Sequence, residues 1–374
     1  MTAVPPARPT PPQLPQPELG LRGLLLVVPI AVFLAVGAGG EGSVLVLAPL
    51  VTYSLPLVAM VAFWWADWPG TRMRAGWGGW VDTVLVAAGA VVLTGLGQAV
   101  AGHLDLRGLF EPSPGPGHVP TFPATMPLGG AAFVAVLQLT LVGEGWPLRR
   151  LRPVPAGLLA VAASWVVALL VYHALVEVDP LPGSGVTGRH GPIPGAEFGA
   201  ALVLIGCWQV LCFVTWRGWP FTRIANRAAR LVTAHLAVLG GGVLTYVIVH
   251  AELGVGTART AALAGCFIAA GLLSGMLFEG WPGARSARVE RLALLLATLT
   301  TTALLAAGLF AIADPMHVSR ISADDWVEHA SLNALATSII LHVAIGRRWP
   351  FGVLDPADRR PGAGRPRRAD RTWR

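Results

Sequence analysis

The chain has 374 residues, of which 54% are hydrophobic and only 13% are charged, and its mean hydropathy is +0.62. A soluble globular protein carries about a quarter charged residues, so this composition excludes an ordinary soluble domain. The apolar residues also occur in long, nearly charge-free blocks. Together these features predict an all-α integral membrane protein.

The basic residues support the same conclusion. All 27 of them are arginine, and the formal net charge is +7. The arginines lie at the ends of apolar blocks rather than along a polar face, which favours membrane topology and argues against a nucleic-acid partner. A chain without lysine and rich in Ala, Gly, Val and Leu is typical of a GC-rich bacterium, so we expect a bacterial inner-membrane protein.

The chain begins and ends in polar tails. Residues 1–20 are proline-rich and residues 355–374 are basic, and both compositions predict disorder. Residues 21–354 form the predicted transmembrane domain, in which each apolar block approaches the ~20 residues that cross a bilayer. About ten helices are expected, at 21–39, 44–66, 81–101, 129–145, 155–177, 197–216, 231–252, 258–279, 291–313 and 329–347.

A Trp-Pro pair follows every second predicted helix. The pairs stand at 68–69, 146–147, 219–220, 281–282 and 349–350. Between consecutive pairs there is room for two helices and a loop, so we predict five parallel two-helix repeats, each ending in a Trp-Pro-x-x-Arg type motif. Their expected bounds are about 21–74, 81–152, 155–227, 231–288 and 291–353, and the last copy has Val353 at the arginine position.

The repeat also predicts an orientation. Two crossings per repeat return the chain to the same side, so both tails and all Trp-Pro turns share one side. That side holds every arginine except Arg107, Arg189, Arg259 and Arg320. By the positive-inside rule it is cytoplasmic, which places both termini in the cytoplasm.

The motif itself predicts contacts with lipid. Tryptophan prefers the headgroup level, proline cannot continue a helix, and a nearby arginine reaches phosphates. The alternative is a ring of arginines that binds an acidic loop of another membrane subunit. The expected interfacial anchors or lipid-binding residues are Trp68, Arg72, Trp146, Arg150, Trp219, Arg223, Trp281, Arg285 and Trp349.

Two glycine patterns predict close helix contacts. The run Gly240-Gly241-Gly242 thins one helix, which favours the approach of a neighbouring helix, with a flat cofactor as the alternative. Gly271 and Gly275 form a small-xxx-small pair of the kind found at helix interfaces. Cys207, Cys212 and Cys266 fall inside apolar helices, which favours packing over disulfide formation.

Histidines and carboxylates recur on the opposite, outer side, where the first helix of a hairpin ends. Imidazole and carboxylate together suit Cu, Fe, Mn or Zn. His173 and Glu177 are four residues apart and share a helical face, as do Asp325 and His329. For each histidine alone, a solvated cap at the membrane surface is the alternative. The predicted metal ligands are His173, Glu177, His250, Glu252, Asp314, His317, Asp325 and His329.

One spacing resembles a known metal site. Asp325, His329 and His342 read D-x3-H-x12-H, which is similar to the metal-ligand spacing in the C subunit of copper membrane monooxygenases. The resemblance covers 18 residues and implies a metal near an oxidising active site. Within one continuous helix, however, thirteen residues separate the two imidazoles by about 20 Å, so a shared metal requires a break in the segment 329–347.

Haem is the alternative use of the histidines. His235 and His250 lie on one predicted helix, and His329 and His342 lie on another that runs the opposite way. Cross-pairing would hold two b-type haems. Helical rotation argues against it, because the first pair is about 60° apart around its helix and the second about 140° apart.

Three functions therefore stay open. The first is a membrane metalloprotein with redox or oxygenase-like chemistry at the outer rim. The second is a permease for a small cation, an amine or a lipid-like substrate. The third is a non-catalytic scaffold or accessory subunit. The sequence has no phosphate-binding glycine loop, HExxH or nucleophile elbow, so it does not decide whether the protein is an enzyme.

Overall fold

The computed structural model describes residues 16–352 except 75, 116, 181–185, 187, 282, 284–285 and 315–320. Within this part the chain consists of helices joined by turns and loops, with one short parallel sheet, β1 (Val176–Glu177) with β2 (Ile193–Pro194). The α-helices are α1 (Gln16–Val36), α2 (Gly40–Gly42), α3 (Ala48–Ala59), α4 (Trp77–Ala101), α5 (Leu106–Phe110), α6 (Met126–Leu137), α7 (Pro153–Leu175), α8 (Gly195–Gln209), α9 (Arg227–Val247), α10 (Thr257–Leu272), α11 (Ala287–Ala313), α12 (Ala323–Glu328) and α13 (Thr337–Ile340).

Several helices contain or end in a π-helical turn. These turns are η1 (Ser43–Leu47), η2 (Met60–Trp64), η4 (Gln138–Val142), η6 (Val210–Thr215), η8 (Ile248–Glu252), η9 (Leu273–Leu277), η11 (His329–Ala336) and η12 (Leu341–Ile345). Three 3₁₀ turns follow Trp-Pro pairs: η3 (Gly70–Arg72), η5 (Leu148–Arg150) and η7 (Phe221–Arg223).

The membrane character of the chain is confirmed. Eight helices of the described part are long and apolar enough to span a bilayer: Pro17–Val36, Gly40–Trp64, Trp77–Ala101, Pro153–Leu175, Gly195–Thr215, Arg227–Glu252, Thr257–Leu277 and Ala287–Ala313. Two of the ten predicted helices are not among these eight spans. Met126–Val142 is apolar but shorter, and the helical run from α12 to η12 carries three carboxylates in its first turns. Whether these two also cross stays a prediction.

The first helix extends into the predicted N-terminal tail. Helix α1 begins at Gln16 rather than at residue 21, because Glu18 and Arg22 form an ion pair one turn apart that supports an earlier start. Residues 1–15 and 355–374, where the remaining tail predictions fall, lie outside the described residues.

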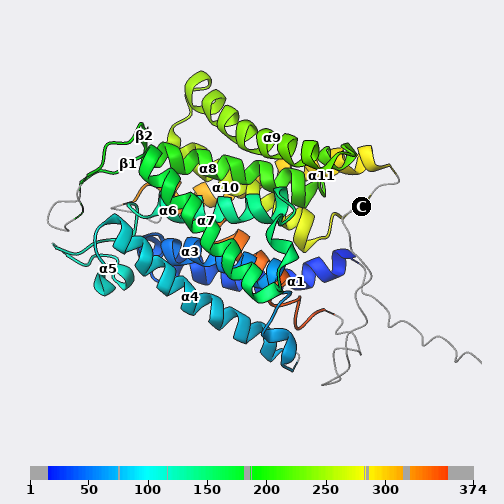
Figure 1. The fold of residues 1–374 in the computed structure, drawn as a ribbon, viewed down its shortest axis with the longest axis horizontal. Helices are drawn as coiled ribbons and strands as arrows, with labels where there is room; N and C mark the ends of the chain where they lie inside the picture. The colour runs from blue at the N-terminus through cyan, green and yellow to red at the C-terminus, as the bar shows by residue number, and fades with distance from the viewer. Residues whose placement is uncertain are drawn as a thin grey trace, which may run out of the picture.

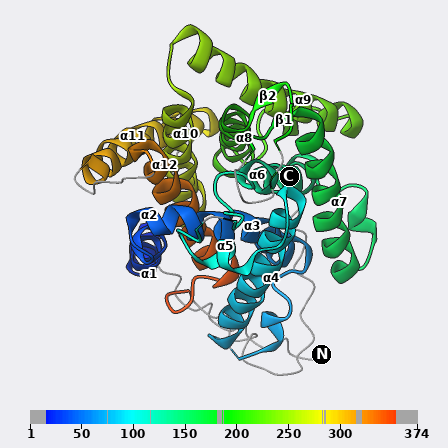
Figure 2. The same ribbon diagram turned by 90° about the vertical axis from the view of Figure 1, so that its left-hand side faces the viewer.

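The helices form two concentric layers (Figure 2). The inner layer is a closed ring in which α3 contacts α6, α6 contacts α8, α8 contacts α10, α10 contacts η11, and η11 contacts α3. The outer helices α4, α7, α9 and α11 pack on α3, α6, α8 and α10 respectively, and α1 packs on η11. The N-terminal helix is therefore the outer partner of the last segment.

Burial follows the two layers. In the inner span Gly40–Trp64, 78% of the apolar window is buried, against 17% in the outer span Arg227–Glu252. Outer helices expose large apolar side chains such as Leu236 and Leu304. Because these side chains would face lipid in a membrane, the outer layer presents the apolar surface that a bilayer requires.

Small residues allow the layers to approach closely. A Cβ on Gly242 of α9 would lie 2.7 Å from the backbone nitrogen and Cα of Ile205 in α8. Gly271 and Gly275 similarly face Val210 and Val214 of η6. The neighbour that the glycine run accommodates is therefore a helix, which is the first of the two alternatives.

Buried polar side chains bond across the inner ring. Thr52 donates to Asn333 at 3.0 Å, and Gln209 donates to Gln138 at 2.9 Å. The three cysteines are buried and free, in agreement with their prediction as packing residues. Interhelical hydrogen bonds of this kind contribute about 0.6–2 kcal/mol each inside a membrane, so they fix helix pairing at the ring centre.

The loops opposite the Trp-Pro turns form a separate cap that includes α5, β1 and β2 (Figure 1). Asp105 caps α5 by accepting from the backbone N–H groups of Arg107 and Gly108, and it also accepts from Val119 N–H and bonds His118 Nδ1. Burial alone would raise the pKa of Asp105, but these donors outweigh it and lower the pKa to about 2. His118, a loop residue without an expected role, thus helps to fix the cap.

The glycine contacts allow a matched stability test on one helix. Gly242→Ala should destabilise the protein by about 1–3 kcal/mol, because the added methyl meets the backbone of Ile205, which cannot rotate away. Gly240→Ala is the control, since a Cβ there meets no atom within 4 Å. We expect a lower unfolding temperature in detergent for the first variant and an unchanged or slightly higher one for the second. Equal unfolding temperatures would contradict the close packing of α9 on α8.

Candidate functional site

The inner helices end in one recurring backbone turn on the Trp-Pro side. Each last turn is π-helical, with an N–H bonded to the carbonyl five residues earlier. A residue with φ between 50° and 53° then follows, and it is Ala66, Glu144, Arg217, Glu279 or Arg347. Such values are uncommon for residues other than glycine. Four of the five side chains at this position are charged, and each of the four takes part in a contact between neighbouring turns.

The fifth turn meets the first through a buried carboxylate. Arg347 Nη2 donates to Asp82 Oδ2 at 2.8 Å, and Arg347 Nε lies 3.7 Å from Asp67 Oδ2. Asp82, on α4, is completely buried, and its other oxygen accepts from the Gly70 N–H at 2.8 Å. A buried carboxylate is costly unless it is paired and hydrogen-bonded, so Arg347 makes the burial of Asp82 tolerable.

The fourth turn contacts both of its neighbours. Arg348 of the fifth turn lies 3.0 Å from Glu279, and it donates to the backbone carbonyls of Met276 and Leu277 at the end of η9. Arg217 of the third turn donates to the Glu279 carbonyl at 2.8 Å. The helix end at η9 is thus capped by guanidinium groups, which is the favourable sign of charge at a C-terminus.

The second turn completes the series. Glu144 accepts from Arg227 Nε at 3.1 Å and from Arg230 Nε at 2.8 Å, both at the start of α9. Between the second and first turns the link is neutral, because Trp65 Nε1 donates to the Val154 carbonyl of α7. We call the charged set the charge belt; its members are Asp67, Asp82, Glu144, Arg217, Arg227, Arg230, Glu279, Arg347 and Arg348.

The predicted anchors surround this belt. The guanidinium groups of Arg72 and Arg223 lie 5.9 Å from the ring centres of Trp68 and Trp219, so the motif brings its own arginine onto its own indole. Trp146, Trp281 and Trp349 are exposed, and Arg150 is exposed in η5. Arg285 lies outside the described residues. Their contact with lipid stays a prediction.

The predicted metal ligands at the outer rim have separate partners. His173 Nδ1 bonds Arg189, whose guanidinium also lies over the Tyr172 ring. Glu177 lies in β1, and its carboxylate is 3.9 Å from His190. The His250 ring stacks on Tyr246, and its Nδ1 bonds the Val255 carbonyl.

The remaining predicted ligands are also dispersed. Asp325 forms a capping box with Ser322 at the start of α12. His329 is buried, and its Nε2 bonds the Leu34 carbonyl of α1 at 2.9 Å. Glu252 and Asp314 are exposed at the ends of η8 and α11, and His317 lies outside the described residues. Across the described part of the chain, no group of three or more His, Cys, Asp or Glu side chains could hold a metal ion.

The spacing D-x3-H-x12-H does not gather its residues. The chain is helical without a break from Ala323 to Ile345, so the condition for a shared metal is not met. His329 lies near the outer end beside Leu34, whereas the His342 ring lies near Phe351 on the Trp-Pro side, 6.4 Å between ring centres.

The haem alternative requires α9, which carries His235 and leads to His250, to pack beside the last helical segment, from α12 to η12, which carries His329 and His342. Instead α9 packs on α8, while the last segment packs on α1, α3 and α10 (Figure 2). His235 of α9 bonds Gln138 in η4, far around the ring from His342. The structure therefore does not bring the two histidine-bearing helices together.

Two features of the belt were missed by sequence reasoning. The residue two positions before the tryptophan alternates in charge through Glu144, Arg217, Glu279 and Arg347, and this alternation was a readable signal for contacts between copies. Asp82 carried less signal, because the predicted helix started at residue 81 and a carboxylate in a first turn is ordinary. The observed α4 starts at Trp77, which places Asp82 inside the helix.

Comparisons with known proteins give no relative: no protein-family model matches the chain, and no curated protein or solved structure matches it significantly.

The belt leads to a prediction about ring stability. Arg347→Ala should destabilise the protein by about 3–5 kcal/mol, because it leaves the buried Asp82 carboxylate without its cation. Adding Asp82→Asn to that variant should restore part of the loss, since the uncompensated charge is gone. The measurement is the unfolding temperature in detergent. Arg72→Ala is the control, because Arg72 is exposed and outside the belt; equal effects of Arg347→Ala and Arg72→Ala would contradict this role.

Proposed function

We propose that the chain is a non-catalytic membrane scaffold that crosses the bacterial inner membrane ten times as five two-helix repeats. In this proposal the Trp-Pro turns and both termini are cytoplasmic, as the arginine distribution favours. The observation that carries it is the charge belt, which ties the turns into one rigid face, while further arginines lie exposed around it. The partner of that face is the anionic lipid of the inner leaflet, with another membrane subunit as the alternative.

The exposed arginines support this partner. Arg149, Arg150 and Arg152 follow the second Trp-Pro pair, and all three are exposed. Arginines near an anionic membrane surface each contribute about 1 kcal/mol of attraction. A rigid ring that places indoles and guanidinium groups at one level would hold a shell of anionic headgroups, and this suits a scaffold better than an enzyme.

Lipid binding tests the proposal directly. We expect purified wild-type protein to retain phosphatidylglycerol in preference to phosphatidylcholine from mixed bilayers, as counted by native mass spectrometry. Changing Arg149, Arg150 and Arg152 together to Gln should reduce that preference by roughly fivefold per arginine, at about 1 kcal/mol each. Arg107→Gln is the control, because Arg107 lies in the cap on the opposite side. An unchanged lipid preference in the triple variant would contradict the proposal.

Elemental analysis separates the scaffold from the metalloprotein hypothesis. We expect protein purified without chelator to carry well under one Cu, Fe, Mn or Zn per chain, because the described rim histidines are bound to separate partners and no three ligands gather among the described residues. Near-stoichiometric metal that is lost in the His250→Ala, His329→Ala double variant would overturn the scaffold and restore the metal site.

A further inference from the structure

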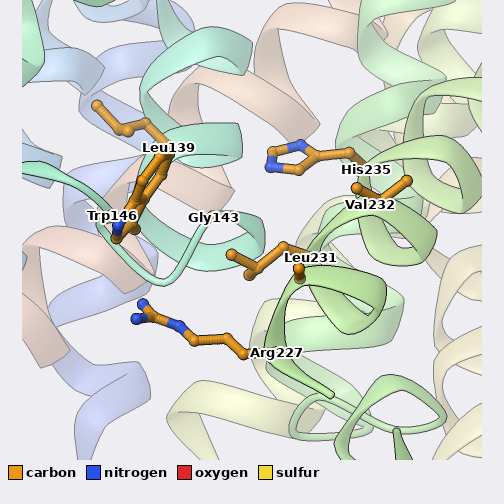
Figure 3. Close-up of a pocket in the computed structure, with 8 residues that line it drawn as sticks. Leu139, Gly143, Trp146, Arg227, Leu231, Val232 and His235 are labelled. Atoms are coloured by element: carbon orange, nitrogen blue, oxygen red, sulfur yellow. The ribbon is translucent and has the colours of Figure 1, made fainter.

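An apolar groove opens at the lateral surface of the ring, between the second Trp-Pro turn and the first half of α9 (Figure 3). Its volume is about 530 Å³, within the usual range of small-molecule sites. Its lining includes Leu139, Trp146, Arg227, Leu231, Val232 and His235. Val232 and Trp146 are exposed at its edges, so a membrane-dissolved molecule could enter from the side.

A chain of hydrogen bonds fixes the tautomer of the histidine in this groove. Gln209 Nε2 donates to the Val134 carbonyl at 3.2 Å and to Gln138 Oε1 at 2.9 Å. The Val134 carbonyl can only accept, so the Gln209 atom beside it must be the amide nitrogen. The Gln138 atom that this nitrogen also contacts must then be the amide oxygen. Gln138 Nε2 is therefore the donor to His235 Nδ1 at 3.1 Å. A neutral imidazole that accepts at Nδ1 carries its proton on Nε2.

The Nε2–H donor is the main polar feature deep in the groove. Figure 3 shows the His235 ring projecting from α9 toward Leu139 and Trp146. Within the described residues no side chain or carbonyl accepts a hydrogen bond from Nε2. Polar chains inside a membrane are costly and mark functional sites, and this one ends in an unused donor that faces an apolar space.

The depth of the donor indicates what it binds. His235 stands eight residues beyond Arg227, or about 12 Å along the helix axis, and Arg227 is paired with Glu144 at the turn. Phospholipid ester carbonyls lie directly beneath their phosphates, whereas hydrocarbon tails carry no acceptor. An occupant must therefore bring its own carbonyl below the headgroup level.

We infer that this groove binds a lipid-soluble molecule with an apolar tail and a ring carbonyl, of the isoprenoid quinone class, whose carbonyl accepts from His235 Nε2–H. Trp146, Leu139 and Leu231 enclose its apolar part. The groove shares Trp146 and Arg227 with the Trp-Pro face, but its donor His235 lies deeper than the headgroup contacts, so quinone binding is tested separately from the scaffold proposal.

A pair of probe molecules, one with ring carbonyls and one without, tests whether the occupant binds through a carbonyl. The protein is placed in nanodiscs of ether-linked phospholipid, which lacks ester carbonyls, and is titrated with decylubiquinone or with decylbenzene while its unfolding temperature is followed. Wild type should bind decylubiquinone about tenfold more tightly than decylbenzene, the worth of one neutral hydrogen bond. His235→Phe should abolish that preference. No preference in wild type, or an unchanged preference in the variant, overturns the inference.

A second pair of variants tests whether the ligand binds in this groove, even if His235→Phe fails to fold. Val232 and Val243 are both exposed on α9, at 58% and 48%, but only Val232 lines the groove. Val232→Trp should block decylubiquinone, and Val243→Trp should leave its binding unchanged. Equal binding by both variants excludes the groove. If ester-linked phospholipid displaces decylubiquinone from wild type, the carbonyl belongs to a phospholipid and the quinone assignment is wrong.

Discussion

Asp82 is a carboxylate that water does not reach, and Arg347 is the cation 2.8 Å away that compensates it. Asp82 lies on α4, which packs on α3, and Arg347 follows η12, so their pairing joins the first and last inner segments of the ring. The other members of the charge belt lie at or next to helix ends on the same side. Their individual ion pairs are partly exposed and individually weak, but the buried pair cannot be separated without leaving an unpaired charge.

The belt also explains why the two faces of the molecule differ. On the Trp-Pro side, charged side chains link the second turn to the start of α9, the third turn to the fourth, the fourth to the fifth and the fifth to the first. A neutral Trp65–Val154 bond joins the first turn to the start of α7, so the five helix ends are connected around the ring. On the outer side, the described titratable groups bond separate partners, as in the Asp105 cap, the Arg189–His173 contact and the His329–Leu34 bond. Residues that recur in sequence at equivalent helix ends form no group of three or more ligands in the described part of the chain, so recurrence alone does not bring them within ligating distance.

Sequence reasoning succeeded where a pattern was local. Apolar blocks predicted the spans, glycines at 242, 271 and 275 predicted close helix contacts, and proline after tryptophan predicted where inner helices end. It failed where contacts depend on which helix ends become neighbours. The Arg347–Asp82 pair spans 265 residues of sequence, and no helical period predicts that. For His329 and His342 the spacing resembled a metal motif, but helical geometry predicted that one continuous helix would keep the two imidazoles apart, and the segment is such a helix.

The position of α1 has a consequence for biogenesis. Its contacts with the last segment, Trp326 to Ala35 and His329 to Leu34, span 291 and 295 residues. The ribosome makes α1 about 290 residues before this partner, so α1 lacks these contacts while the intervening helices are synthesised. Long-range contacts of this kind form slowly, so the closed ring forms only after the segment from Ala323 to Ile345 has been inserted beside α1.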